Sequence, residues 1–166
     1  MNGSYIIRPF AAAEAITYKS IRLEALLAEP GMFGNSYAME ASFEESHWSE
    51  RVNNHRGCCF GLYYAGELIG VTSIIMNSID RPQDAYMTQS YIRQAHRGKG
   101  LSRLLYDARL EWARSHGVKR LLIGHRASNI VSKAANQHYG FVYSHSEPRI
   151  WPDGTAEDML YYELVL

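Results

Sequence analysis

The period of the hydrophobic positions changes several times along the chain, and each change marks a boundary between predicted elements. At the amino end, a short strand at 4–8 precedes a helix that ends at Glu29-Pro30-Gly31. The apolar side chains that fall on one face of this helix are Ala12, Ile16, Leu23, Leu26 and Leu27. Residues 31–43 are predicted to form a loop with a short helical piece, and a second helix is predicted at 44–53.

Beyond residue 53 the pattern becomes that of strands, interrupted by one amphipathic helix. Apolar runs at 59–65 and 68–76, joined by Ala65-Gly66-Glu67, predict a β-hairpin. The clearest helix begins after Gly100 and ends at Gly117, and its apolar stripe consists of Leu101, Leu104, Leu105, Ala108 and Trp112. The remaining predicted elements are strands at 84–93, 119–124, 140–145 and 159–166, a helix at 128–139 and a turn at 151–154.

This order of elements predicts one α/β domain that spans residues 1–166. Most strands follow one another directly, so they are expected to pair as neighbours, except in a strand–helix–strand unit at 84–124. A chain of this length buries enough surface to hold a core without disulfides or metals.

Composition and charge narrow the range of functions. The chain has 17 Lys and Arg against 17 Asp and Glu, a balance that argues against a nucleic-acid-binding protein. Its two cysteines, Cys58 and Cys59, are neighbours, which predicts reduced thiols and a cytoplasmic protein. No apolar run approaches the length of a membrane span, and the histidines have no metal-ligand spacing. We therefore expect no signal peptide, no membrane partner and no metal.

A glycine-rich loop lies between the predicted strand at 84–93 and the helix that follows it. Its sequence is Arg97-Gly98-Lys99-Gly100-Leu101-Ser102. Glycines allow the backbone to approach a ligand closely, and the unpaired N–H groups at the start of a helix favour phosphate. A tight turn with solvated basic residues is the alternative. The loop does not fit a dinucleotide-binding fingerprint, because Arg103 occupies the position of that motif's third glycine. It does not fit a P-loop either, because no G-x-x-x-x-G-K-[ST] occurs in the sequence.

The sequence around this loop resembles a known family. Tyr91-Ile92 and the six residues from Arg97 to Ser102 are similar to the acyl-CoA loop, R/Q-x-x-G-x-G/A, of the GNAT superfamily of N-acetyltransferases. Downstream, Asn129-x-x-Ser132-x-x-x-Asn136-x-x-x-Gly140-Phe141 is similar to that superfamily's second motif, N-x-x-A-x-x-x-Y-x-x-x-G-F. The order of the predicted elements also fits, so the resemblance covers nearly the whole chain.

The resemblance implies a fold and a reaction. The fold is a mixed, mostly antiparallel central sheet flanked by helices, with the strands at 84–93 and 119–124 splayed apart. The reaction is direct attack of a primary amine on acetyl-CoA, the acyl donor, without a metal. We expect a small amine or an amino acid as the acceptor. One alternative is that the acceptor is a protein N-terminal α-amine, and another is that the protein is a non-catalytic acyl-CoA-binding sensor. Whether the protein forms a homodimer is left open.

The resemblance also implies which residues contact the donor. They are Tyr91, Ile92, Arg97, Gly98, Lys99, Gly100, Leu101, Ser102, Arg103, Asn129 and Ser132. The alternative role of Asn129 is a helix cap. Asn136 stands where the family has the tyrosine that protonates the departing thiolate, and Tyr139 lies three residues further along the helix. We predict Asn136 and Tyr139 as catalytic residues, with core packing as the alternative for Tyr139.

The acceptor site is expected to form from the loop after the first helix, the 77–84 connection and the 146–156 hairpin. Its predicted lining residues are Phe33, Tyr37, Glu40, Glu44, Asp84, Trp151, Asp153 and Glu157. Arg149 could equally bind a substrate carboxylate. A general base is needed for an amine of high pKa, and the candidates are Glu40, Glu44, Asp84, Gln89 through a water molecule, and His125.

Overall fold

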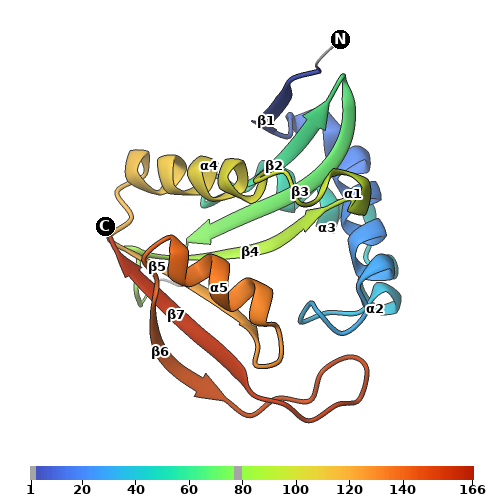
Figure 1. Cartoon of the computed structure of the whole chain (residues 1–166). Helices are drawn as coiled ribbons and strands as arrows, with labels where there is room; N and C mark the ends of the chain where they lie inside the picture. Colours follow the sequence, from blue (N-terminus) through green and yellow to red (C-terminus); the bar gives the residue numbers. More distant parts are fainter. Residues whose placement is uncertain (1–2, 77–79) are drawn as a thin grey trace.

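All strands of the described residues, 3–76 and 80–166, join one sheet in the order β1-β2-β3-β4-β5-β7-β6 in the computed structural model (Figure 1). The strands are β1 (Tyr5–Pro9), β2 (Gly57–Tyr64), β3 (Glu67–Met76), β4 (Asp84–Ile92), β5 (Arg120–Arg126), β6 (Val142–Glu147) and β7 (Met159–Val165). Neighbouring strands are antiparallel except β4 and β5, which are parallel. The expected mixed, mostly antiparallel sheet is confirmed.

Helices cover both faces of this sheet. They are α1 (Ala15–Ala28), α2 (Tyr37–Ala41), α3 (Glu45–Asn53), α4 (Ser102–Ser115) and α5 (Ile130–His138). Helices α4 and α5 lie on one face and α1 and α3 on the other (Figure 1). One core cluster joins α4 to the sheet through Tyr106, Leu110 and Ile123, and a second joins α1 and α3 to it through Tyr18 and Trp48. In the described residues, no helix combines the length and apolar character that a membrane span requires.

The two central strands separate along their length. Pairing between β4 and β5 runs from Asp84 opposite Arg120 to Met87 opposite Ile123 and then stops. A bulge in β4 follows directly: Gln89 has a φ of +62°, and the register with β3 shifts at this point. Because a bulge bends its strand, β4 turns away from β5 here. The expected splay between these strands is confirmed.

The buried faces of two helices differ from the predicted stripes. In α1 the predicted stripe was correct only in part, because Leu26 is buried as predicted, whereas Ile16 and Leu27 are 75% and 66% exposed. The residues that α1 buries are Tyr18, Ile21, Arg22, Ala25 and Leu26. Ala12 belongs to a 3₁₀ turn that precedes α1, so the helical face predicted from Ala12 differs from the face that α1 buries. In addition, a pattern of apolar residues cannot indicate that Arg22 is buried.

In α4 the predicted stripe was correct only in part. Leu101 and Leu105 are buried as predicted, whereas Leu104, Ala108 and Trp112 are only half-buried. The remaining buried residues of this helix are Tyr106, Arg109, Leu110 and Ala113. The buried face of α4 is wider than its stripe of apolar residues, because α4 packs against both the sheet and the residues around α5.

Candidate active site

A cleft of about 260 Å³ opens where β4 and β5 part. Its walls come from β4, β5, α4, α5 and the connection between α1 and α2. The sequence-predicted site residues that it brings together are Phe33, Gln89, Ser102, His125, Asn129, Ser132 and Asn136. The cleft also contains Tyr106 and Arg109, which the sequence analysis did not select.

The glycine loop precedes α4 with its backbone donors unused. Gly98 and Gly100 have φ angles of +76° and +72°, a region that side-chain-bearing residues rarely adopt. Within the described chain, the backbone N–H groups from Gly98 to Ser102 donate no hydrogen bond. These donors and the positive end of the α4 dipole form a setting that suits an anion. Lys99 adds an exposed positive charge.

Arg97 does not extend toward this anion setting. Its Nε donates to the Ile92 carbonyl oxygen at 2.7 Å, and its Nη2 forms an ion pair with Glu29 at 2.5 Å. The guanidinium also lies 5.7 Å from the centre of the Tyr91 ring. The Arg97 side chain thereby fastens the loop to β4 and to the end of α1. Its contact with the donor stays a prediction.

Asn129 caps α5. Its Oδ1 accepts a hydrogen bond from the Ser132 backbone N–H at 3.1 Å, so the alternative role as an N-cap is what the structure shows. Asn129 and Ser132 nevertheless both line the cleft. Their contact with a ligand therefore stays a prediction.

Asn136 is held by a tyrosine from another helix. The Tyr106 hydroxyl donates to the Asn136 Oδ1 at 2.5 Å, and Asn136 is only 1% exposed. The Asn136 Nδ2 is buried and has no hydrogen-bond partner among the described residues. Burial raises the pKa of Tyr106 to about 12, so its phenol stays protonated and keeps the amide in this orientation.

Tyr139 packs on Tyr106 and does not line the cleft. The two rings stack with centroids 4.0 Å apart and planes 9° from parallel. This arrangement favours the packing alternative for Tyr139. The phenol that reaches Asn136 comes instead from Tyr106, 30 residues away in the sequence.

Arg109 is a buried cation at the floor of the cleft. It is 1% exposed, its Nε donates to the Leu105 carbonyl oxygen at 3.0 Å, and its guanidinium carbon lies 5.0 Å from the Tyr106 ring centre. No carboxylate in residues 3–76 or 80–166 pairs with it, and its Nη1 has no partner. Burial lowers the pKa of Arg109 to about 10. An arginine within the helix stripe was the available sequence signal.

One ring nitrogen of His125 forms a hydrogen bond, and the other has no partner among the described residues. Its Nδ1 lies 2.7 Å from the Arg126 carbonyl oxygen, which can only accept, so this nitrogen carries the proton. The Nε2, with its lone pair, is buried and has no partner in the described part of the chain. His125 therefore has an unused proton acceptor in a residue that lines the cleft.

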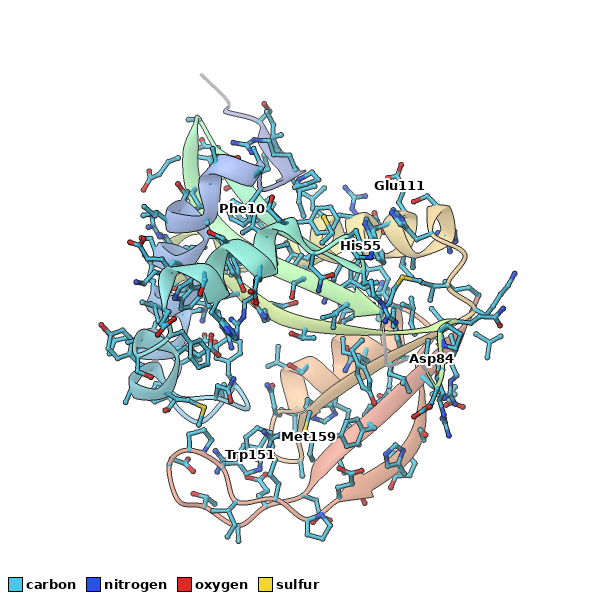
Figure 2. All side chains as sticks on the ribbon, turned by 180° about the vertical axis from the view of Figure 1, so that it is seen from behind. Phe10, His55, Asp84, Glu111, Trp151 and Met159 are labelled. Atoms are coloured by element: carbon cyan, nitrogen blue, oxygen red, sulfur yellow. The ribbon has the colours of Figure 1, made fainter. Side chains whose placement is uncertain are left out.

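Two predicted acceptor residues are committed to ion pairs elsewhere. Glu40 is fully buried between Arg22 and Arg51, each 2.8 Å from one of its oxygens. Burial raises its pKa, but the two guanidinium groups outweigh this and lower it to about 2, so Glu40 is no general base. Asp84 pairs with Arg120 at 2.6 Å, where β4 and β5 are still joined, and lies far from Trp151 (Figure 2). The expectation that Glu40 and Asp84 serve the acceptor is corrected.

The other predicted acceptor residues, apart from Phe33, do not line the cleft. Tyr37 and Glu44 are exposed on and beside short helices, and Trp151 is buried with its Nε1 donating to the Glu157 carbonyl oxygen at 2.8 Å. Only Phe33 of the predicted lining residues is a cleft residue. Residues 77–79 of the expected 77–84 connection lie outside the described residues.

The hairpin at 146–156 is tied to the connection after α1. Arg126 donates to the Gly31 carbonyl oxygen at 3.0 Å and forms ion pairs with Asp153 and Glu157. Arg149 donates to the Gly34 carbonyl oxygen at 3.1 Å, so its guanidinium is partly committed to this contact. These contacts hold the connection between α1 and α2 against the end of β5 and the hairpin.

The adjacent cysteines are free thiols. Cys59 is buried, Cys58 is half-buried, and neither lines the cleft. Burial raises the pKa of Cys58 to about 12 and that of Cys59 to about 11. Both thiols stay protonated near neutral pH, which makes them poor nucleophiles.

Comparison with known proteins adds independent information. The model of the acetyltransferase (GNAT) family matches residues 22–141. No curated protein matches the sequence significantly.

Among solved structures, a protein of Acinetobacter baylyi assigned as an acetyltransferase has a TM-score of 0.83 and 19% identity, covering 99% of this chain and 93% of that one. A Salmonella typhimurium protein with the same assignment, solved with its cofactor acetyl-CoA, has a TM-score of 0.81 and 20% identity, over 98% and 94% of the chains. The ribosomal-protein-alanine N-acetyltransferase of Brucella melitensis has a TM-score of 0.80 and 21% identity, over 97% and 99%. At such identities these similarities show a shared fold.

Proposed function

The chain belongs to the GNAT family of acetyltransferases, and we propose that it transfers the acetyl group of acetyl-CoA to a primary amine of a small molecule or an amino acid. The observation that carries the proposal is the cleft between β4 and β5, which has unpaired backbone donors at one end and the free amide nitrogen of Asn136 inside. The Salmonella typhimurium structure of this fold contains acetyl-CoA.

The chain has suitable groups for both parts of the donor. The N–H groups at 98–102, the α4 dipole and Lys99 would bind the pyrophosphate. Beyond Met87, β4 has no β5 partner on one side, so its backbone groups there can pair with the amide-rich arm as an added strand would. The Ile92 carbonyl oxygen, which accepts from Arg97, is not among these groups. The loop itself is open to a ligand, since an added Cβ at Gly98 or Gly100 would meet nothing within 4 Å.

The reaction needs a deprotonated amine and a departing thiolate. The amine nitrogen attacks the thioester carbonyl carbon, the carbon–sulfur bond breaks with its electron pair on sulfur, and the Nε2 of His125 accepts the proton that the amine loses. A lysine-type amine with a pKa of about 10.4 needs about 4.6 kcal/mol for deprotonation at pH 7, whereas an α-amine with a pKa of about 7.8 needs only about 1.1 kcal/mol. His125 therefore matters most for acceptors of high pKa.

The experiment that tests the proposal is thiol release from acetyl-CoA with a panel of amines, amino acids, polyamines and short peptides. We expect turnover with small primary amines or amino acids, and a larger loss in a His125→Asn variant for acceptors of high pKa. Turnover with peptide N-termini alone would favour a protein α-amine acetyltransferase. Binding of acetyl-CoA without any turnover would favour the non-catalytic sensor, and a lack of binding would contradict the proposal altogether.

Replacement of Tyr106 by phenylalanine tests the orientation of Asn136. The Asn136 Oδ1 would lose its buried donor, so we expect the free energy of unfolding to fall by about 1–3 kcal/mol. Turnover should fall about tenfold, because we propose that the Nδ2 donates to the thioester sulfur and the amide would no longer be held in one orientation. Urea unfolding and steady-state kinetics measure both effects. If Tyr139→Phe reduces turnover more than Tyr106→Phe does, then Tyr139 is the phenol that acts on the thioester.

A further inference from the structure

The electrostatics of the cleft are dominated by Arg109. This guanidinium is fully buried on α4, beside the point where β4 and β5 part, and the described residues provide no carboxylate for it. Its side-chain contacts are a backbone carbonyl of its own helix and the ring of Tyr106. A buried unpaired charge destabilises a fold by several kcal/mol, about 3–5 when a partner is lost. Arg109 therefore occupies a position that packing alone does not explain.

Three of the buried nitrogens without a partner in the described part of the chain belong to the cleft, and they indicate which charge Arg109 would meet. Nη1 of Arg109, Nδ2 of Asn136 and Nε2 of His125 are buried, lack partners among the described residues, and belong to residues of the same cleft. Two of them, on Arg109 and Asn136, are donors only. A cationic amine would be repelled by this guanidinium, so the fitting ligand atom is one that carries negative charge.

We propose that Arg109 stabilises the negative charge that develops on the CoA sulfur when the thioester breaks. The inference rests on the proposed function and deepens it. As the amine nitrogen bonds to the carbonyl carbon, the electron pair of the broken bond stays on sulfur, and the thiolate later takes a proton from solvent. In a cleft of low dielectric, a fixed cation and the Asn136 Nδ2–H stabilise that thiolate far more than they would in water.

This role accounts for asparagine at position 136. A leaving group that departs as a stabilised thiolate needs no proton donor at that position. Tyr106 would be a poor proton donor, because burial raises its pKa to about 12 and its proton is already given to Asn136. Tyr106 is thus a positioning residue, which contacts Arg109 through its ring and Asn136 through its hydroxyl.

The test is the pKa of the CoA thiol bound to the protein, followed through the ultraviolet absorbance of the thiolate between about pH 7 and 9.5. Desulfo-CoA, which lacks the thiol, provides the blank. We expect the bound thiol to have a pKa at least about one unit below that of free CoA, a tenfold rise in the ratio of thiolate to thiol. In Arg109→Met and Arg109→Gln variants the pKa should return to that of free CoA or exceed it, because burial then acts alone.

Other groups at the cleft are controlled in the same experiment. The remaining titratable side chains in its lining are Tyr106, Glu29, which pairs with Arg97, and His125. Measurement in a His125→Asn background removes the histidine contribution. The exposed Arg114→Met on the same helix is the matched control for loss of one positive charge and should leave the thiol pKa unchanged.

Kinetics and stability complete the test. Turnover should fall on the order of 10²-fold in both Arg109 variants, with acetyl-CoA and desulfo-CoA affinities unchanged. Arg109→Met should unfold at the same or a higher temperature, since it removes an unpaired buried charge. Equal thiol pKa values in wild type and Arg109 variants would overturn the inference, even if turnover falls. If the wild type binds neither CoA nor acetyl-CoA, the proposed function itself fails.

Discussion

Replacement of Gly100 by valine is expected to lower acetyl-CoA affinity by about tenfold to 100-fold while the chain still folds. Gly100 has a φ of +72°, and a β-branched residue forced into that region is strained by about 1–3 kcal/mol. The strain is relieved if the loop changes shape, and the unpaired N–H groups at 98–102 then no longer converge on the pyrophosphate. Calorimetric titration with acetyl-CoA measures the loss.

Gly117 provides the matched control. It also has a φ of +72°, and an added Cβ there would likewise meet nothing within 4 Å, but it follows the opposite end of α4. Gly117→Val should therefore reduce stability by a similar amount and leave the affinity unchanged. Equal affinities of the Gly100→Val variant and the wild type would contradict the loop as the pyrophosphate site.

Replacement of Glu40 by alanine is expected to lower the free energy of unfolding by about 3–5 kcal/mol at neutral pH. Glu40 is the shared partner of Arg22 and Arg51, and it also accepts a hydrogen bond from Asn35 at 3.0 Å. Without it, the buried Arg22 guanidinium loses its counter-ion. Urea unfolding measures the change. Glu24→Ala, which breaks a half-exposed pair with Arg93, should lower stability by no more than about 1 kcal/mol.

The same carboxylate predicts a pH dependence. The pKa of Glu40 is lowered to about 2 in the folded protein, below the value of about 4.3 in an unfolded chain. Its contribution to the free energy of unfolding is therefore fully present at pH values above about 4.3. It is lost as the pH falls toward 2. The stability difference between wild type and Glu40→Ala should therefore shrink between about pH 5 and 2. A difference that stays constant over this range would show that Glu40 acts by packing alone.

The strand and helix order, the hairpin at Ala65-Gly66, the mixed sheet and the glycine loop followed from the sequence. These features depend on residues close together in the chain: a hydrophobic period reports one face of one element, and a glycine at positive φ reports a local turn. The two motifs that carry the resemblance are likewise local strings. The splay of the central strands followed from that resemblance.

The tertiary structure decided which side chains meet. Tyr106 reaches Asn136 across 30 positions, Arg22 and Arg51 neutralise Glu40, and Arg109 lies buried without a carboxylate from the residues that the structure describes. A hydrophobic pattern treats charged residues as solvated, because burial of a charge usually requires a partner from another element, as Arg22 and Arg51 provide for Glu40. The partner is set by the packing of whole elements, and no period within one element encodes it.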